Sequence, residues 1–142
     1  MSINIGIVGA TGNVGREMLS ILCERGFDKK NIFPIASSRS EGMKVSYGND
    51  EISVESLEKF DLNKIQVALF SAGSEISKDW APKFAKAGCV VIDNSSHFRM
   101  DPDVPLIIPE VNEEALADYK KKNIIANPNC STAQLLVALK PL

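Results

Sequence analysis

An apolar strand that runs into a glycine-spaced turn constrains this chain more than any other stretch. Residues 3–8 are apolar at nearly every position, as a strand covered on both faces of a parallel sheet requires. Gly9, Gly12 and Gly15 follow at intervals of three and lead into a helical pattern. Glycine is needed where such a turn bends, where its backbone approaches a pyrophosphate, and where the helix packs back on the strand. We therefore predict a nucleotide-binding strand, turn and helix, with a plain structural turn as the alternative.

The remaining elements alternate in the same way along the chain. Buried strands are predicted at residues 31–36, 65–70, 89–93 and 124–126, and helices at residues 14–25, 75–87, from 112, and 133–139. Residues 44–54 read as a small hairpin appended to this order. The chain is therefore expected to be an α/β protein with a doubly wound parallel sheet and a hairpin insertion.

Four residues carry local expectations within these elements. Gly26 should end the first helix in a left-handed conformation, and Pro34 should place its strand near a sheet edge or at a bulge. Pro82 implies irregular first turns in the helix over residues 75–87. Asn112 should cap the short helix that follows it.

The end of the second strand bears on the choice of nucleotide. A site selective for NAD places an acid there to bind the ribose 2′-hydroxyl, whereas this sequence has Ser38, Arg39 and Ser40. Hydroxyls and a guanidinium suit a 2′-phosphate, which a carboxylate would repel. NADP is therefore preferred over NAD, with a solvated serine-rich loop as the alternative. Ser71 and Gly73, after the next strand, are part of a small-residue segment that lets a ligand cross the strand end.

Polar residues after the strand at residues 89–93 lie where open α/β sheets bind ligands. Arg99 is a candidate oxyanion binder because its planar fork suits phosphate or carboxylate, and a surface ion pair is its alternative. His97 is the only histidine in the chain. An incidental loop histidine is favoured over a catalytic base.

Cys130 lies where the last strand meets the last helix, between Asn129 and Ser131. Free N–H groups and the helix dipole stabilise a thiolate at such a junction, which favours a nucleophile over a structural cysteine. Cys23 lies beside the apolar face of the first helix, which is typical of a buried structural thiol. Because the three cysteines are widely spaced, neither a disulfide framework nor a metal site is expected.

Length and charge exclude several classes of protein. The 142 residues suffice for one domain with its own core. A formal net charge of −2, with acids and bases interspersed, lacks the basic excess of a nucleic-acid binder. The sequence has no long apolar run for a membrane span and no export leader, so the cytoplasm is the expected location.

Taken together, these motifs resemble the amino-terminal part of aspartate-semialdehyde dehydrogenases. The resemblance covers essentially the whole chain and depends most on residues 94–99, Asn-Ser-Ser-His-Phe-Arg, and residues 127–132, Asn-Pro-Asn-Cys-Ser-Thr. It implies a Rossmann-type fold and the reversible, NADP-linked conversion of aspartyl β-phosphate to aspartate β-semialdehyde, a step towards lysine, methionine and threonine. Cys130 would form the acyl thioester that accepts hydride.

The resemblance also assigns binding residues. It places the cofactor phosphates on Gly9, Thr11, Gly12, Asn13 and Val14, the 2′-phosphate on Ser38, Arg39 and Ser40, the cofactor's path along Ser71 and Gly73, and the substrate phosphate on Arg99 and Asn129.

Length is the main departure from this family. Its members are more than twice as long, so residues 1–129 are expected to form the NADP-binding domain and residues 130–142 to begin a truncated catalytic and dimerisation domain. The family's acid-base histidine is not matched by His97. The chain alone is expected to be inactive, and the full-length enzyme to be a homodimer that binds neither nucleic acid nor membranes.

Three other functions are alternatives to this one. An N-acetyl-glutamyl-phosphate reductase shares the glycine turn but differs after the cysteine, and a non-catalytic NADP-binding module would have no use for a reactive thiol. A short-chain dehydrogenase requires Tyr-x-x-x-Lys, whereas Tyr47 is followed four residues later by Glu51 and Tyr119 by Asn123.

Overall fold

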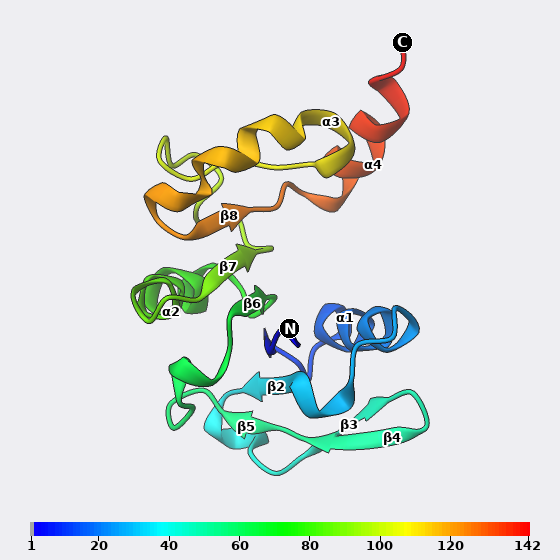
Figure 1. Ribbon diagram of the computed structural model, residues 1–142, viewed down its shortest axis with the longest axis vertical. Coiled ribbons are helices and arrows are strands. Elements are labelled where there is room, and N and C mark those ends of the chain that lie inside the picture. Colours follow the sequence, from blue (N-terminus) through cyan, green and yellow to red (C-terminus); the bar gives the residue numbers. More distant parts are fainter. Residues whose placement is uncertain (1) are drawn as a thin grey trace.

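A parallel sheet forms the centre of the computed structural model, which describes residues 2–142 (Figure 1). Within those residues the sheet has six strands in the order β5-β2-β1-β6-β7-β8. The strands are β1 Ile5–Val8, β2 Ile32–Ala36, β5 Glu55–Ser56, β6 Val67–Phe70, β7 Val90–Asp93 and β8 Ile124–Ala126. β1 pairs with β2 on one side and β6 on the other, so the strand order reverses beside it. The predicted doubly wound α/β fold is confirmed.

Helices cover the sheet from both sides. The α-helices are α1 Asn13–Glu24, α2 Ser74–Lys86, α3 Pro109–Asn112 and α4 Cys130–Leu139, and the 3-10 helices are η1 Lys29–Asn31, η2 Ser38–Ser40, η3 Leu62–Lys64 and η4 Glu113–Lys121. In Figure 1 α2 lies to the left of the sheet and α1 to the right, while α4 extends away from the rest at the upper right. In residues 2–142 no helix combines the length and the apolar character that a membrane span needs.

Adjacent residues of β1 serve opposite cores, because side chains alternate along a strand. Val8 belongs to the α2 side, where the rings of Phe70 and Phe84 meet edge to face with centroids 5.1 Å apart. Ile7 belongs to the α1 side, against Leu19. Each face of the sheet therefore has its own apolar cluster, which explains why the strand sequence is apolar at consecutive positions.

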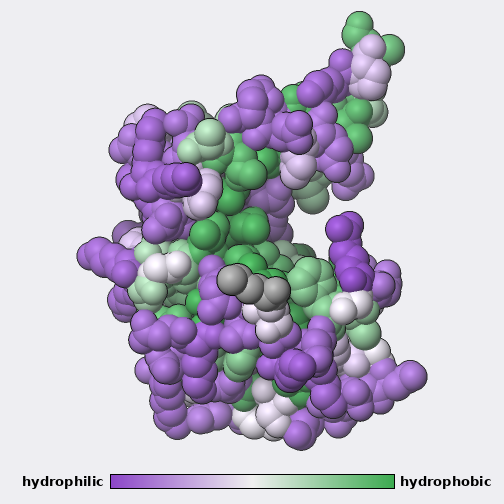
Figure 2. Space-filling view, in the orientation of Figure 1, coloured by the Kyte–Doolittle hydropathy of each residue, from purple (hydrophilic) through white to green (hydrophobic). Residues whose placement is uncertain are grey.

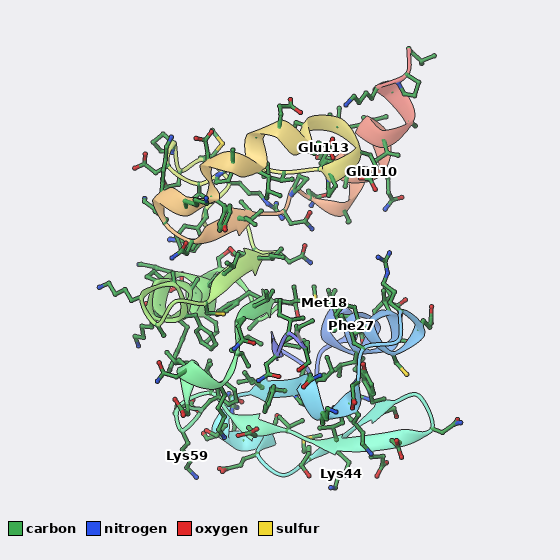
Figure 3. All side chains as sticks on the ribbon, in the orientation of Figure 1. Met18, Phe27, Lys44, Lys59, Glu110 and Glu113 are labelled. Atoms are coloured by element: carbon green, nitrogen blue, oxygen red, sulfur yellow. The ribbon has the colours of Figure 1, made fainter. Side chains whose placement is uncertain are left out.

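The hairpin insertion extends the core on the α1 side. β3 (Lys44–Tyr47) and β4 (Asp50–Ser53) pair antiparallel across a turn in which Gly48 has a φ of +61°. The Tyr47 hydroxyl donates to the carbonyl oxygen of Phe27 (2.7 Å), and Phe27 and Met18 pack against the same cluster (Figure 3). The predicted hairpin is thus confirmed, and it anchors the end of α1.

Two of the four local expectations are confirmed. Gly26 has a φ of +78° after α1, in the left-handed region that favours glycine. Only the last two residues of β2, Ile35 and Ala36, pair with the short β5, so among residues 2–142 no strand pairs with the outer edge of β2 at Pro34. A proline is tolerated there because its missing N–H leaves no ladder partner unsatisfied on that edge.

The other two expectations are wrong. α2 runs without a break from Ser74 to Lys86 even though Pro82 lies inside it and cannot donate to the carbonyl four residues earlier, because buried Ala81 and Phe84 hold this part of the helix in the core. Asn112 ends α3 and occupies the N-cap position of η4, but its side chain makes no capping hydrogen bond there. Its Oδ1 accepts from Ile108 N (2.9 Å) and its Nδ2 donates to the Leu106 carbonyl (2.9 Å), so the amide closes the preceding loop.

Candidate cofactor and nucleophile site

The glycine turn is dictated by steric contacts at two of its three glycines. Gly9 has a φ of +92°, and a Cβ built on it would lie 2.7 Å from the Ser71 carbonyl oxygen. A Cβ on Gly15 would lie 2.8 Å from Ala10 Cα and closer still to the Gly9 carbonyl. A Cβ on Gly12 would meet only the Gly9 carbonyl, at an ordinary 3.5 Å. Packing therefore explains Gly9 and Gly15, whereas the open side of Gly12 is left for a ligand.

The start of α1 beside Gly12 presents unsatisfied donors. Gly12 is the N-cap residue and no side chain of residues 2–142 caps the helix there. The first N–H groups of a helix have no intrahelical partner, so those of Asn13 and Val14 are available to an anion. Both residues are exposed, and Arg16 Nε donates to the Thr11 carbonyl (3.1 Å), which adds a positive charge near the turn.

A cavity of about 310 Å³ adjoins this turn. Its lining comes from the ends of β1 and β2, from the segment after β5, and from the start of α2: Val8, Gly9, Thr11, Ala36, Ser37, Arg39, Leu57, Glu58, Ala72 and Ile76. The fold thus brings together three predicted residues, Gly9, Thr11 and Arg39. A cavity between a glycine turn and a guanidinium suits a nucleotide whose phosphates lie on α1 and whose adenosine ribose lies near β2.

The remaining predicted cofactor residues surround the cavity without lining it. Ser38 and Ser40 form η2 together with Arg39. Ser71 comes directly after β6, and its N–H donates to the Val8 carbonyl at the end of β1 (2.8 Å). It therefore lies beside the glycine turn. Gly73 is the exposed N-cap residue of α2 with a φ of +88°.

Glu58 is a cavity residue that the sequence analysis missed. Ser56 Oγ donates to Glu58 Oε2 (2.7 Å), and this hydrogen bond lowers the pKa of Glu58, as do the backbone amides of Glu58 itself and of Ser38. The side chain therefore carries its negative charge at neutral pH. Its sequence position gave no signal, because it reaches the cavity only through the pairing of β5 with β2.

The predicted nucleophile follows β8, the edge strand at the opposite side of the sheet from β5. Cys130 is the first residue of α4 and is exposed. Asn129 caps the helix, since its Oδ1 accepts from Ser131 N (2.9 Å), and the Cys130 Sγ lies 3.8 Å from the same oxygen. The cap fixes the start of the helix and leaves the thiol accessible to a small molecule.

Arg99 joins the loops that follow β7 and β8. Its Nε donates to the Asn127 carbonyl (2.9 Å) and its Nη2 to the Asn94 carbonyl (3.1 Å). The side chains of Asn127 and Asn94 also bond to each other. Two donors of the guanidinium thus have backbone partners, and one of these is Asn127, three residues before Cys130 in the chain. Its other N–H groups are in position for an anion.

Asp93 anchors the same loop from within the core. It is fully buried at the end of β7, and its carboxylate accepts from Ser77 Oγ (2.6 Å), Ser95 Oγ (2.7 Å) and Ser95 N (3.1 Å). The pair Ser74 and Ser96, with hydroxyl oxygens 3.0 Å apart, adds a second link to α2. The sequence contained a signal for this anchor, a carboxylate closing a buried strand, which was not assigned a role.

The other titratable side chains near this loop have different surroundings. His97 is exposed, and its backbone N–H donates to Ser95 Oγ (3.2 Å). Cys89 is fully buried, and that burial raises the pKa of its thiol to about 12. Of the three cysteines, Cys130 is thus the one that is exposed.

A family model described as the NAD-binding domain of semialdehyde dehydrogenases matches residues 4–119. The aspartate-semialdehyde dehydrogenase of Aquifex aeolicus is 57% identical over the whole chain, which corresponds to 42% of that protein. The enzyme of a Shewanella species is 54% identical over 98% of the chain and 41% of its own length. The chain therefore spans about two fifths of the curated relatives that it matches.

Solved structures of aspartate semialdehyde dehydrogenases are also similar to this chain. The chain superimposes with a TM-score of 0.94 on aspartate semialdehyde dehydrogenase II from Vibrio cholerae complexed with ASA, at 54% identity over 99% of this chain and 46% of that one. Against the Candida albicans aspartate semialdehyde dehydrogenase with NADP, the TM-score is 0.76 at 28% identity, over 98% of this chain and 46% of that one.

Proposed function

Because this chain belongs to the aspartate-semialdehyde dehydrogenase family, as its NAD(P)-binding amino-terminal domain, we propose that it serves the reductive dephosphorylation of aspartyl β-phosphate to aspartate β-semialdehyde with NADP as the cofactor. The observation that carries the proposal is that the glycine turn and Cys130 follow strands of one parallel sheet and so open on the same edge. From β1 to β8 there are three strand spacings, roughly 14 Å, a separation suited to an extended dinucleotide.

The cofactor half of the site uses the turn, the cavity and η2. The N–H groups of Asn13 and Val14 bind the pyrophosphate, with Thr11 and Gly12 beside it, because the open side of Gly12 lets the backbone approach. Arg39, with Ser38 and Ser40, binds the ribose 2′-phosphate. Ser71 and Gly73 lie along the path towards Cys130.

Cys130 supplies the covalent chemistry. Its thiolate attacks the acyl carbon of aspartyl β-phosphate, the bond from carbon to the phosphate oxygen breaks, and inorganic phosphate leaves with the electron pair. When bound, the nicotinamide supplies the hydride that reduces the resulting thioester to the aldehyde. The Cys130 sulfur then departs as thiolate and is ready for the next cycle. Exposure of the thiol beside a polar cap supports this role.

Arg99 and Asn129 bind the phosphate of the substrate. The Arg99 guanidinium is held by two carbonyl oxygens, which orient its remaining N–H groups without using them. A preoriented cation stabilises the charge that gathers on the leaving phosphate more than a freely moving one does. In this assignment residues 1–129 form the cofactor domain, and residues 130–142 begin the catalytic part.

The test is to assay cofactor binding and turnover on one preparation of the 142-residue chain. We expect NADPH to bind, as followed by its fluorescence, and phosphate-dependent oxidation of aspartate semialdehyde to be absent. The 142 residues include a candidate nucleophile and line a cofactor cavity, whereas the single histidine among them, His97, is an exposed loop residue. Positioning and proton transfer, which supply much of a rate enhancement, are therefore lacking.

Two results would overturn parts of this proposal. Failure to bind either NADPH or NADH would remove the cofactor function. Robust turnover that is lost in Cys130→Ser would show that the chain contains the whole catalytic apparatus, and would restore His97 as the candidate base.

A further inference from the structure

The end of β2 has no acidic residue in the sequence, but the segment that follows the neighbouring strand β5 places a carboxylate near it. β5 runs parallel to β2, with Ile35 opposite Glu55 and Ala36 opposite Ser56, so the two strands end at the same edge. Glu58 follows β5 by two residues and lines the same cavity as Arg39. An acid and a guanidinium therefore face one pocket from two strand ends.

The Glu58 carboxylate is fixed in place. Ser56 is buried, and its hydroxyl donates to Glu58 Oε2 at 2.7 Å. One carboxylate oxygen is thus tied to the sheet, and the carboxylate, which is exposed, keeps lone pairs that can accept from a ligand. Lys59, the next residue, is bonded instead to Glu41 (2.8 Å) and points away from the sheet in Figure 3.

From this arrangement we propose that Glu58 is a cofactor-specificity residue: it accepts a hydrogen bond from the ribose 2′-hydroxyl of NAD and repels the 2′-phosphate of NADP. This inference rests on the cofactor function proposed above. Arg39 attracts the 2′-phosphate and Glu58 opposes it, so the pocket binds both dinucleotides with only a moderate preference for NADP. Judged on the end of β2 alone, the sequence overstates that preference.

The charge of Glu58 can be tested without disturbing the core, because the side chain is exposed. We would measure the dissociation constants of NADPH and NADH for the 142-residue chain and its Glu58→Gln variant. Glutamine keeps the size and a hydrogen-bond acceptor but removes the repulsion. The ratio of NADPH to NADH affinity should rise by about two- to fivefold, the size of a screened interaction between charges at a surface.

Glu55→Gln is the matched control. It removes the same charge three residues earlier in the chain, on β5, but Glu55 pairs with Lys64 (3.7 Å) and does not line the cavity. Its affinity ratio should equal that of the unchanged chain. Glu58→Ala provides a second variant, in which NADH affinity should fall because the acceptor is lost while NADPH affinity rises.

The outcomes separate this inference from the proposed function. If the unchanged chain binds NADPH and the ratio in Glu58→Gln matches that in Glu55→Gln, Glu58 has no part in specificity and the inference fails alone. A chain that binds neither dinucleotide would overturn the inference together with the cofactor function. A selective rise in the ratio on changing Glu58 supports both.

Discussion

At the scale of single residues, the glycines of the turn can be told apart by adding one methyl group to each. Gly15→Ala should destabilise the fold by about 2 kcal/mol or more, because the new Cβ would overlap the backbone of Gly9 and Ala10 and push α1 off β1. Gly12→Ala meets only an ordinary contact at a φ of −76°, so its stability should hardly change. Urea unfolding of both variants measures the difference.

The same pair also reports on cofactor binding. Gly12→Ala should fold normally and yet bind NADPH less tightly, since its methyl group occupies the open side where the pyrophosphate approaches. Unchanged NADPH affinity in a folded Gly12→Ala variant would mean that the phosphates lie elsewhere.

Arg39 should set most of the preference for NADPH over NADH. It lines the cavity and is exposed, so its pairing with a 2′-phosphate is a charge-assisted contact screened in part by solvent. Arg39→Ala is expected to lower the affinity ratio by about tenfold. Isothermal titration with both dinucleotides tests this, and Arg16→Ala, which should weaken both equally, is the control. An unaltered ratio in Arg39→Ala would discard the assignment.

Cys130 should be alkylated by iodoacetamide much faster than Cys89 between pH 7 and 9. Cys130 is exposed at the start of α4, whereas Cys89 is fully buried with a pKa raised to about 12. The Cys89 thiol therefore stays protonated, and unreactive, until the pH approaches that value. Peptide mapping after brief labelling gives the order, with the unfolded chain in urea as the control in which the three cysteines react alike. Equal labelling in the folded chain would contradict the assignment of Cys130.

At the scale of elements, α4 has apolar side chains that no other element covers. In the part of the chain that the structure describes, α4 has no buried residue, and Leu135 and Leu139 are 58% and 46% exposed. Figure 2 shows the hydrophobic atoms of this end projecting from the polar surface. Such a helix favours self-association or fraying.

The 142-residue chain should therefore associate as its concentration rises. Sedimentation velocity over a hundredfold concentration range is expected to show a growing average mass, and replacing Leu135 and Leu139 by Ser should reduce it, because that removes exposed apolar area. Replacing Met100, which is 91% exposed on a different segment, is the control. A monomer at every concentration would show that α4 is not adhesive.

Strong periodic patterns made the main elements predictable, and pairing between distant segments made the rest unpredictable. β8 and the glycine turn appear where the sequence placed them, because apolar runs and glycines signal locally. β5 has two residues and exists only through its register with Ile35 and Ala36. A 3-10 helix, η4, lies where the sequence predicted an α-helix. The Asn112 side chain, which was expected to cap it, accepts from Ile108 N in the preceding loop instead.

At the scale of the whole molecule, the sequence predicted the two ends of the candidate site but not what connects them. Residues on one motif, such as Asn129 and Cys130, were found together because they are neighbours in the chain. The anchoring of Arg99 by Asn127 and the presence of Glu58 and Arg39 in one cavity arise from strand order, which places loops more than fifteen residues apart at one edge. No local pattern encodes such a neighbour.

The position of β1 also determines how the molecule opens. Its four residues are buried and paired on both sides, so their amide protons should exchange with solvent only when the sheet separates as a whole. The amides of α4 need no more than local fraying. In a hydrogen-exchange time course the peptide with the nucleophile would take up deuterium within the first samples, while the strand before the cofactor turn would remain protected to the last.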